Sequence, residues 1–339
     1  MTTAKNKNIA ILGAGSWGTT LAVLLARNGY RAFLWGHDPM QMARLAQERG
    51  NAVYLPEVPF PTNLIIEPNL PQLANETGYF LIAVPSHAFR STLQAIKPYL
   101  SAGGLLAWAT KGVEPDSAIP LSNVVQEVLS EAVPAAVISG PSFAREVAVG
   151  LPTALVVAAR DAAVSEAVAQ WLRNERMRVY TSHDVTGVEI GGAVKNVMAI
   201  AAGISDGLGF GANARAALIT RGLAEIARLG VALGGLAETF MGLAGAGDLV
   251  LTCTDNLSRN RQVGLALGQG RKLQEVLSGL GQVAEGVTSA PAVRVLAKRM
   301  QVEMPITEQV CRVLFENLSP QAAVEALLRR EPRQEEWGA

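Results

Sequence analysis

Residues 9–18 read Ile-Ala-Ile-Leu-Gly-Ala-Gly-Ser-Trp-Gly, four apolar residues followed by three glycines in G-x-G-x-x-G spacing. An apolar, strand-like run precedes the glycines, and residues 21–25 continue as a predicted helix. In this context Gly13 permits a tight turn, Gly15 lets backbone N–H groups approach a pyrophosphate, and Gly18 lets the helix pack closely on the sheet. The stretch therefore predicts a dinucleotide site and redox chemistry. The alternative is a glycine-rich turn that binds nothing.

Composition narrows the class of protein. A chain of 339 residues, 49% of them hydrophobic, predicts about two domains with ample core. Lys plus Arg and Asp plus Glu number 29 each, which argues against a nucleic-acid or acidic-membrane partner. Cys253 and Cys311 are expected to be buried thiols, and His37, His87 and His183 are too scattered for a metal site. No stretch approaches the roughly twenty apolar residues of a membrane span, so we expect a soluble, cytoplasmic protein.

Apolar strands alternate with helices through the first half of the chain. Predicted strands after the first cover residues 31–35, 63–67, 79–84, 105–109, 135–139, 153–159 and 177–180. This pattern predicts an α/β domain with a mainly parallel, doubly wound sheet. Later segments read as helices, at 193–204, 214–229, 290–299 and 321–328. We therefore predict a Rossmann-like dinucleotide-binding domain over residues 1–188 and an all-α substrate-binding and catalytic domain over residues 189–339. The charged tail, residues 331–339, is expected to be frayed.

Ligands of a doubly wound sheet lie beyond the carboxyl ends of its strands. The residues that follow predicted strand ends are Ser16-Trp17, His37, Pro85-Ser86, Lys111 and Gly140-Pro141-Ser142. Among them Lys111 is predicted to be a cation over the cofactor and substrate. The alternative for Lys111 is a solvated loop charge.

The end of the second strand bears on the choice of cofactor. An acidic residue there would bind a ribose 2′-hydroxyl and repel a 2′-phosphate. Here the chain reads Gly36-His37-Asp38, and Asp38 is better placed as the N-cap of a helix with Pro39 at N1 and Gln41 at the capping-box position. His37 can face a 2′-phosphate, so NADPH is favoured, with NADH still open.

Lys195 interrupts an otherwise small and apolar predicted helix. Burying an ammonium costs several kcal/mol unless it is paired or deprotonated. Desolvation would lower its pKa toward the range of a general acid–base catalyst. Asp248, which follows a glycine-rich turn, is a candidate partner. The alternatives are a lysine that extends to the surface and an aspartate that caps a helix.

Residues 258–261 read Ser-Arg-Asn-Arg and supply hydroxyl, guanidinium and amide donors in succession. Such donors suit a phosphate oxyanion. Solvated loop residues are the alternative.

The chain resembles the bacterial NAD(P)-dependent glycerol-3-phosphate dehydrogenases over essentially its whole length. The matching motifs are Gly13-Ala-Gly-Ser-Trp-Gly-Thr, Val84-Pro-Ser-His, Ala109-Thr-Lys-Gly112, Ser139-Gly-Pro-Ser-Phe-Ala144, Gly192-Ala-Val-Lys-Asn196, Gly207-Leu-Gly-Phe-Gly-Ala-Asn213, Gly242-Leu-Ala-Gly-Ala-Gly-Asp-Leu249, Ser258-Arg-Asn260 and Val283-Ala-Glu-Gly286. The resemblance implies reversible reduction of dihydroxyacetone phosphate to sn-glycerol 3-phosphate with NADPH or NADH, as an entry to phospholipid synthesis. It also implies a homodimer.

The same resemblance implies roles for individual residues. Lys195 matches the proton donor and acceptor of the family. The positions that match substrate contacts are Lys111, Gly140, Ser142, Lys195, Asp248, Ser258, Arg259 and Asn260. The positions that match cofactor contacts are Ser16, Trp17, His37, Lys111, Ala144, Arg259, Val283 and Glu285, beside the glycines Gly13, Gly15 and Gly18.

One departure from the family is Asp255, where glycine is frequent before Ser-Arg-Asn. Because aspartate tolerates a left-handed backbone, we expect the loop to keep its shape. The sequence leaves two rival functions open. One is a dehydrogenase of the 3-hydroxyacid or 6-phosphogluconate type, and the other is a non-catalytic nicotinamide sensor.

Overall fold

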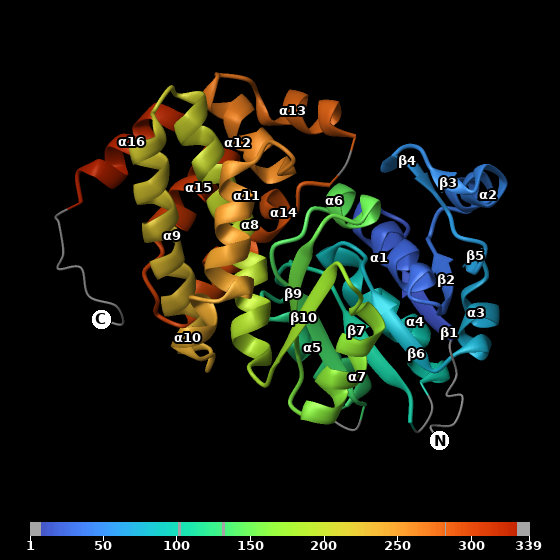
Figure 1. The fold of residues 1–339 in the computed structure, drawn as a ribbon. Helices are drawn as coiled ribbons and strands as arrows, with labels where there is room; N and C mark the ends of the chain where they lie inside the picture. The colour runs from blue at the N-terminus through green and yellow to red at the C-terminus, as the bar shows by residue number, and fades with distance from the viewer. Residues whose placement is uncertain (1–7, 101–102, 131–132, 282, 331–339) are drawn as a thin grey trace. The chain divides into compact units, whose positions relative to one another are not determined.

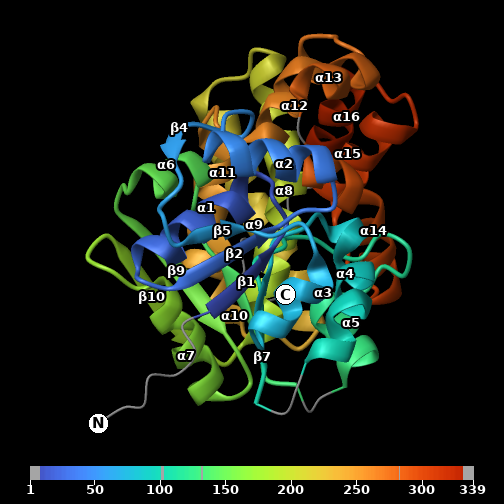
Figure 2. The same ribbon diagram turned by 90° about the vertical axis from the view of Figure 1, so that its right-hand side faces the viewer.

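The computed structural model describes residues 8–100, 103–130, 133–281 and 283–330 (Figures 1 and 2). The predicted frayed tail at 331–339 lies outside these residues. The described chain divides into two compact units. Unit 1 comprises the residues up to Thr110 together with Ser122–Val185, and unit 2 comprises Lys111–Leu121 together with the residues from Thr186 onward. The predicted domains, residues 1–188 and residues 189–339, remain a prediction.

Unit 1 contains an eight-stranded sheet in the order β10-β9-β8-β7-β6-β1-β2-β5. The strands are β1 (Asn8–Leu12), β2 (Arg31–Trp35), β5 (Leu64–Ile66), β6 (Tyr79–Ile82), β7 (Leu105–Trp108), β8 (Ala135–Ser139), β9 (Thr153–Ala158) and β10 (Met177–Ser182). All neighbouring pairs are parallel except β8 and β9. The mainly parallel sheet predicted from the sequence is confirmed. Because β2 and β6 flank β1 on opposite sides, the strand order reverses at β1, where such folds bind their ligands.

Helices connect these strands. They are α1 (Ser16–Arg27), α2 (Pro39–Glu48), α3 (Leu70–Glu76), α4 (Phe89–Ile96), α5 (Leu121–Leu129), α6 (Ala144–Val149) and α7 (Ala162–Leu172), with short turns η1 (Ser86–Ala88) and η2 (Lys97–Tyr99). A small antiparallel hairpin, β3 (Gly50–Asn51) and β4 (Leu55–Pro59), was not predicted. Its two-residue first strand is too short to show a period in the sequence.

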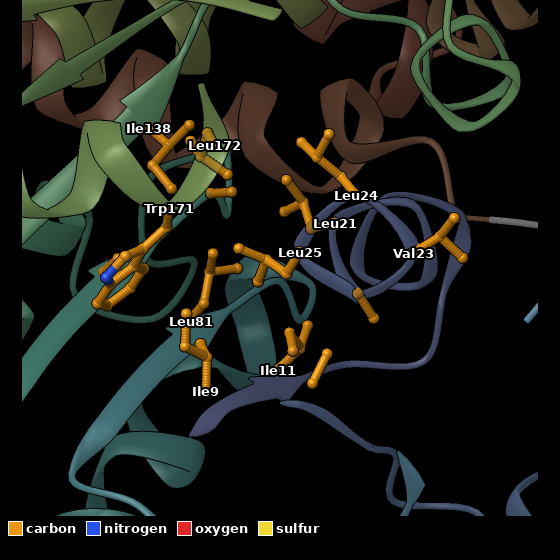
Figure 3. Packing of buried hydrophobic residues seen from close by; sticks show 14 of the residues in the cluster. Ile9, Ile11, Leu21, Val23, Leu24, Leu25, Leu81, Ile138, Trp171 and Leu172 are labelled. Atoms are coloured by element: carbon orange, nitrogen blue, oxygen red, sulfur yellow. The ribbon is translucent and has the colours of Figure 1, made fainter. Parts of the chain in front are cut away.

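Successive side chains along each strand point to opposite faces of the sheet, so each face has its own hydrophobic core. On one face Ile11 packs with Leu21 and Leu25 of α1, while Trp171 of α7 covers the neighbouring strands (Figure 3). On the other face the Phe89 ring meets Trp108 edge-on, 6.3 Å between centroids. Burial on both faces explains why these strands read as continuous apolar runs rather than alternating ones.

In its described residues, unit 2 has helices and one isolated bridge, between Val113 and Pro120, as its regular structure. Its helices are α8 (Val185–Gly207), α9 (Ala212–Ala232), α10 (Ala237–Phe240), α11 (Asp248–Thr254), α12 (Arg259–Gly268), α13 (Leu273–Leu280), α14 (Glu285–Arg299), α15 (Pro305–Phe315) and α16 (Pro320–Leu328), with a π-helical turn η3 (Leu243–Gly247). The all-α prediction for this part of the chain is confirmed. Both predicted thiols, Cys253 and Cys311, are buried and free here.

Helix α8 overturns one sequence-based expectation. Its 23 residues are long and apolar enough to cross a membrane by composition, contrary to the expectation that no stretch comes close. The whole of that apolar window is buried inside the protein. The helix is therefore the central core helix of unit 2, where apolar side chains are needed on every face.

Candidate active site

The glycine turn in unit 1 joins β1 to α1 at the strand reversal. Gly13 has a φ of +120°, and a Cβ there would lie 2.7 Å from the carbonyl oxygen of Ala83, just beyond β6. A Cβ on Gly18 would lie 1.8 Å from the carbonyl oxygen of Gly13. Both positions therefore require glycine for the turn itself. At Gly15, by contrast, a Cβ would meet no protein atom within 4 Å.

The residues near Gly15 fit a dinucleotide phosphate. Helix α1 begins at Ser16 with no side-chain cap and no acidic residue in its first turn. Its first N–H groups and the positive end of its dipole are therefore available to an anion. The open space in front of Gly15 is where a pyrophosphate would approach the backbone. Trp17 lies on the same first turn and is half-buried.

Other parts of unit 1 bring predicted residues to this turn. Gly36 lies against Ala14, since a Cβ on Gly36 would be 2.9 Å from the Ala14 Cβ, so the exposed His37 follows directly beside the turn. The Thr20 hydroxyl donates to the carbonyl of Ala144 (3.0 Å), which places the start of α6 next to α1.

The helix that follows His37 was predicted correctly in part. The Asp38 carboxylate caps α2 by accepting from the Met40 N–H (2.9 Å), and Pro39 is its first residue. The capping-box role of Gln41 was wrong. Its side-chain amide donates instead to the carbonyl of Ala14 (2.9 Å), because the glycine turn offers a carbonyl that needs a donor.

Sequence reasoning missed Asn51 in this region. Its amide donates to the carbonyl of Ala14 (3.2 Å) and to the Thr19 hydroxyl (2.9 Å), and the residue is 1% exposed. The hairpin strand β3 thus fixes the glycine turn from the side. In the sequence, Asn51 is a polar residue next to a glycine, and this context does not indicate its structural role.

Gly140 and Ser142 follow the end of β8. Gly140 is buried with a φ of +129°, and the Ser142 hydroxyl donates to its carbonyl (3.1 Å). Gly140 and Ser142 both belong to unit 1. Their assignment as substrate contacts stays a prediction.

In unit 2, two lysines converge on one carboxylate. Lys195 on α8 donates to Oδ1 of Asp248, and Lys111 donates to Oδ2 (2.6 Å). Lys195 is 6% exposed and Asp248 is fully buried. The inward orientation of Lys195 and its pairing with Asp248 are therefore confirmed. The alternative roles, a surface lysine and a helix cap, do not apply, since Lys195 is buried and Gly247 holds the N-cap position of α11.

The environment of Lys195 changes the pKa of its ammonium. Burial lowers the pKa of its ammonium to about 7, and the nearby charge of Lys111 adds to this, while Asp248 acts in the opposite direction. An amine with a pKa near neutrality can both give and accept a proton under ordinary conditions. The arrangement can therefore serve a reaction that runs in either direction.

Thr252 completes this cluster and was also missed. It lies one turn after Asp248 on α11, donates to the Asp248 carbonyl (2.6 Å) and accepts from Lys195 (2.9 Å). The i, i+4 spacing of an aspartate and a threonine on one helix was the available signal.

The Ser258–Asn260 segment forms the start of α12. The Ser258 hydroxyl caps this ten-residue helix by accepting from the Arg261 N–H (3.2 Å), which leaves the hydroxyl proton to donate. Asn260 donates to the side chain of Asn196 (3.0 Å) and accepts from the Gly286 N–H (2.8 Å). The helix N-terminus and the neighbouring guanidinium of Arg259 form a setting that favours an anion.

The structure differs from the sequence analysis at two residues of this segment. Asp255 has a φ of −103°, so the position does not need the left-handed backbone that would favour glycine. Its carboxylate accepts from the Leu257 N–H (2.7 Å) and shapes the loop. Arg261, the last of the four residues read as phosphate donors, is buried and directs its guanidinium to other protein groups.

The remaining predicted cofactor positions lie at the start of α14. Val283 is 43% exposed, and Glu285 is half-buried in the first helical turn. Among the described residues there is no group of three or more His, Cys, Asp or Glu side chains that could hold a metal ion.

The glycine turn of unit 1 and the buried lysine–aspartate pair of unit 2 are features of a nicotinamide-dependent dehydrogenase. The family model described as NAD-dependent glycerol-3-phosphate dehydrogenase N-terminus matches residues 8–165, and its C-terminal counterpart matches residues 184–325. The chain belongs to the NAD-dependent glycerol-3-phosphate dehydrogenase family.

Individual relatives agree with this assignment. Glycerol-3-phosphate dehydrogenase [NAD(P)+] of Thioalkalivibrio sulfidiphilus is 55% identical, over 96% of this chain and 98% of the relative. The enzyme of the same name from Pseudoalteromonas translucida is 53% identical over the same shares. A crystal structure of glycerol-3-phosphate dehydrogenase from Coxiella burnetii superposes with a TM-score of 0.93 at 49% identity, covering 95% of this chain and 99% of that one.

Proposed function

We propose that this chain catalyses the reversible NAD(P)H-dependent reduction of dihydroxyacetone phosphate to sn-glycerol 3-phosphate, which supplies phospholipid synthesis. The buried Lys195–Asp248 pair is the observation that carries the proposal, because a cofactor-binding sensor has no use for a tuned acid–base group. Family membership supports the choice of substrate.

Residues of unit 2 have different roles in the proposed reaction of the substrate. The Lys195 ammonium donates its proton to the ketone oxygen during reduction, and the resulting amine takes a proton from the alcohol in the reverse direction. The ammonium of Lys111 stabilises negative charge that develops on that oxygen. Asp248 orients both lysines through its two oxygens. Bound NADPH or NADH supplies the hydride.

Phosphate binding positions the substrate. Ser258, Arg259 and Asn260 donate to the phosphate at the N-terminus of α12, which fixes the substrate at a group that does not react. Binding energy from this remote group then contributes to rate through orientation of the ketone. Gly140 and Ser142 are further substrate contacts by resemblance to the family.

The cofactor contacts are proposed in two sets. In unit 1 they are Gly13, Gly15, Ser16, Trp17, Gly18, His37 and Ala144, and in unit 2 they are Lys111, Arg259, Val283 and Glu285. NADPH is favoured, since His37 is exposed next to the glycine turn and the nearby Asp38 carboxylate caps α2. Replacing His37 with Asp should move the preference toward NADH, measured as the ratio of kcat/KM for the two cofactors.

The deciding assay follows absorbance of the reduced nicotinamide with dihydroxyacetone phosphate and NADPH or NADH in parallel. Oxidation that depends on the ketone is the expected result. Cofactor binding without turnover would favour a sensor, and turnover of a 3-hydroxyacid or 6-phosphogluconate instead would favour the related dehydrogenases. From the family resemblance we also propose that the protein is a cytoplasmic homodimer. Sedimentation of the purified protein tests the dimer.

A further inference from the structure

Arg261 makes contacts that reach three separate elements of unit 2. Its Nε donates to the carbonyl of Cys253 at the end of α11 (3.1 Å), and its terminal nitrogens donate to the side chains of Asn256 and Asp206. The Arg261–Asp206 contact is 2.5 Å long, and both side chains are less than a tenth exposed. One guanidinium thus ties the start of α12 to α11, to the intervening loop and to α8.

The backbones of α8 and α12 meet at the same place. A Cβ on Gly203 of α8 would lie 2.1 Å from the carbonyl oxygen of Arg261, and a Cβ on Gly264 of α12 would lie 2.0 Å from that of Ile200. The two helices therefore touch without side chains between them. This contact fixes their separation, and the Arg261 guanidinium fixes the direction in which α12 begins.

These contacts join the two halves of the proposed site. Helix α8 carries Lys195, α11 carries Asp248, and α12 begins with the proposed phosphate-binding residues. The distance from the proton-donating amine to the bound phosphate depends on how α12 sits against α8 and α11.

We propose that Arg261 and Asp206 are positioning residues for substrate phosphate: their ion pair holds the start of α12 at the distance from Lys195 that dihydroxyacetone phosphate requires. Neither side chain touches the substrate in this proposal. The inference rests on the proposed function, because it presumes that the start of α12 binds phosphate.

The test compares Arg261→Lys with the wild-type protein. A lysine keeps the charge, but its single nitrogen cannot reach the three partners that the separate nitrogens of the guanidinium contact. We expect the KM for dihydroxyacetone phosphate, and the inhibition constant of inorganic phosphate against it, to rise by a factor of about ten to a hundred. The kcat should fall by a smaller factor than the KM rises, since Lys195 and Asp248 keep their own contacts while the ketone is oriented less precisely. The pH at which kcat/KM declines should also stay in place.

Arg215→Ala is the matched control. Arg215 on α9 also pairs with Asp206 (3.0 Å), but its hydrogen bonds within the described chain reach α8 rather than the loop or α12, and its side chain is 30% exposed. Its removal should leave the KM for dihydroxyacetone phosphate and the phosphate inhibition constant near the wild-type values. If Arg261→Lys fails to fold, as judged by circular dichroism, Asn256→Ala severs only the contact between the guanidinium and the loop and should raise both constants less strongly.

Three results would overturn the proposal. They are an unchanged KM and phosphate inhibition constant in the folded Arg261→Lys or Asn256→Ala protein, a rise as large in Arg215→Ala, and a loss confined to kcat. The failure of the proposed function itself would be distinct, since then the wild-type protein would not turn over dihydroxyacetone phosphate.

Discussion

Lys195 and Asp248, 53 positions apart in the sequence, form an ion pair in which the carboxylate is fully buried. The second oxygen of that carboxylate accepts from Lys111, so one negative charge faces two ammonium groups. An uncompensated positive charge in a buried site favours release of a proton from the more deeply buried amine. The pairing thus explains how Lys195 can be held in place and remain titratable near neutral pH.

Lys195→Ala should lower kcat for ketone reduction by on the order of a hundredfold to ten-thousandfold, the usual contribution of a general acid. The protein should fold, because Lys111 still pairs with Asp248. The dissociation constant for NADPH, measured by fluorescence titration, should change little. Lys298→Ala, which removes an exposed lysine of α14, is the control and should leave kcat unaltered. Near-normal turnover in Lys195→Ala would refute the assigned role.

The pH dependence of the two directions should be opposite. In the proposed mechanism reduction needs protonated Lys195, whose pKa is lowered to about 7 by burial. The kcat/KM of reduction should therefore fall as pH rises above about 7. Oxidation of glycerol 3-phosphate needs the neutral amine of Lys195. The rate of oxidation should therefore rise with pH up to the pKa of Lys195, about 7, and then become constant. Initial rates in both directions across a buffer series give the two profiles. Profiles that move together would exclude Lys195 as the shared group.

Variants at two glycines distinguish the structural role of the glycine turn from its role in cofactor binding. Gly18→Ala should destabilise the protein by at least about 2 kcal/mol, because the new Cβ would overlap the Gly13 carbonyl oxygen. Gly15→Ala should change stability by less than about 0.5 kcal/mol, since its Cβ meets no protein atom. It should nevertheless raise the dissociation constant for NADPH, because that Cβ occupies the approach of the pyrophosphate. Denaturant unfolding and cofactor titration test both. Unimpaired NADPH binding by Gly15→Ala would contradict the assignment of the turn.

Glu225 should impose a pH dependence on stability. Its buried carboxylate accepts from the N–H groups of Ile306 (2.6 Å) and Thr307 (3.2 Å) at the start of α15, and burial raises its pKa from 4.5 to about 7. Between these values the folded state holds a proton that the unfolded state has lost. The contribution of Glu225 to the free energy of unfolding therefore falls as pH rises through that window and is smallest above about 7.

Glu225→Gln should flatten this dependence, as seen in urea unfolding at several pH values. Glu275→Gln, at an exposed glutamate in the first turn of α13, should retain the wild-type slope. A wild-type slope in the Glu225→Gln protein would show that the carboxylate does not hold its proton.

The sequence was sufficient for features that are local or periodic. The glycine spacing and the apolar runs predicted the sheet, and Asp38-Pro39 predicted the start of α2, because each depends on neighbouring residues. Burial of Lys195 followed from the small residues around it.

Features that depend on residues far apart in the sequence could not be predicted. The roles of Asn51 and Gln41 arise because the Ala14 carbonyl lies within reach of both side chains, which no spacing in the sequence reveals. The sequence predicts a phosphate donor at Arg261, because its actual partner Asp206 lies 55 positions away. A segment rich in hydrogen-bond donors does not reveal from its sequence which groups those donors contact.

The segment Lys111–Leu121 belongs to unit 2, although the chain on either side of it belongs to unit 1. A gene fragment starting at residue 186 would encode Lys195 and Asp248 but omit the second lysine of their cluster. The helical unit is therefore not a transferable module in a single stretch of coding sequence. Grafting it onto another cofactor-binding scaffold, by recombination in nature or in the laboratory, would require two insertions instead of one fusion point.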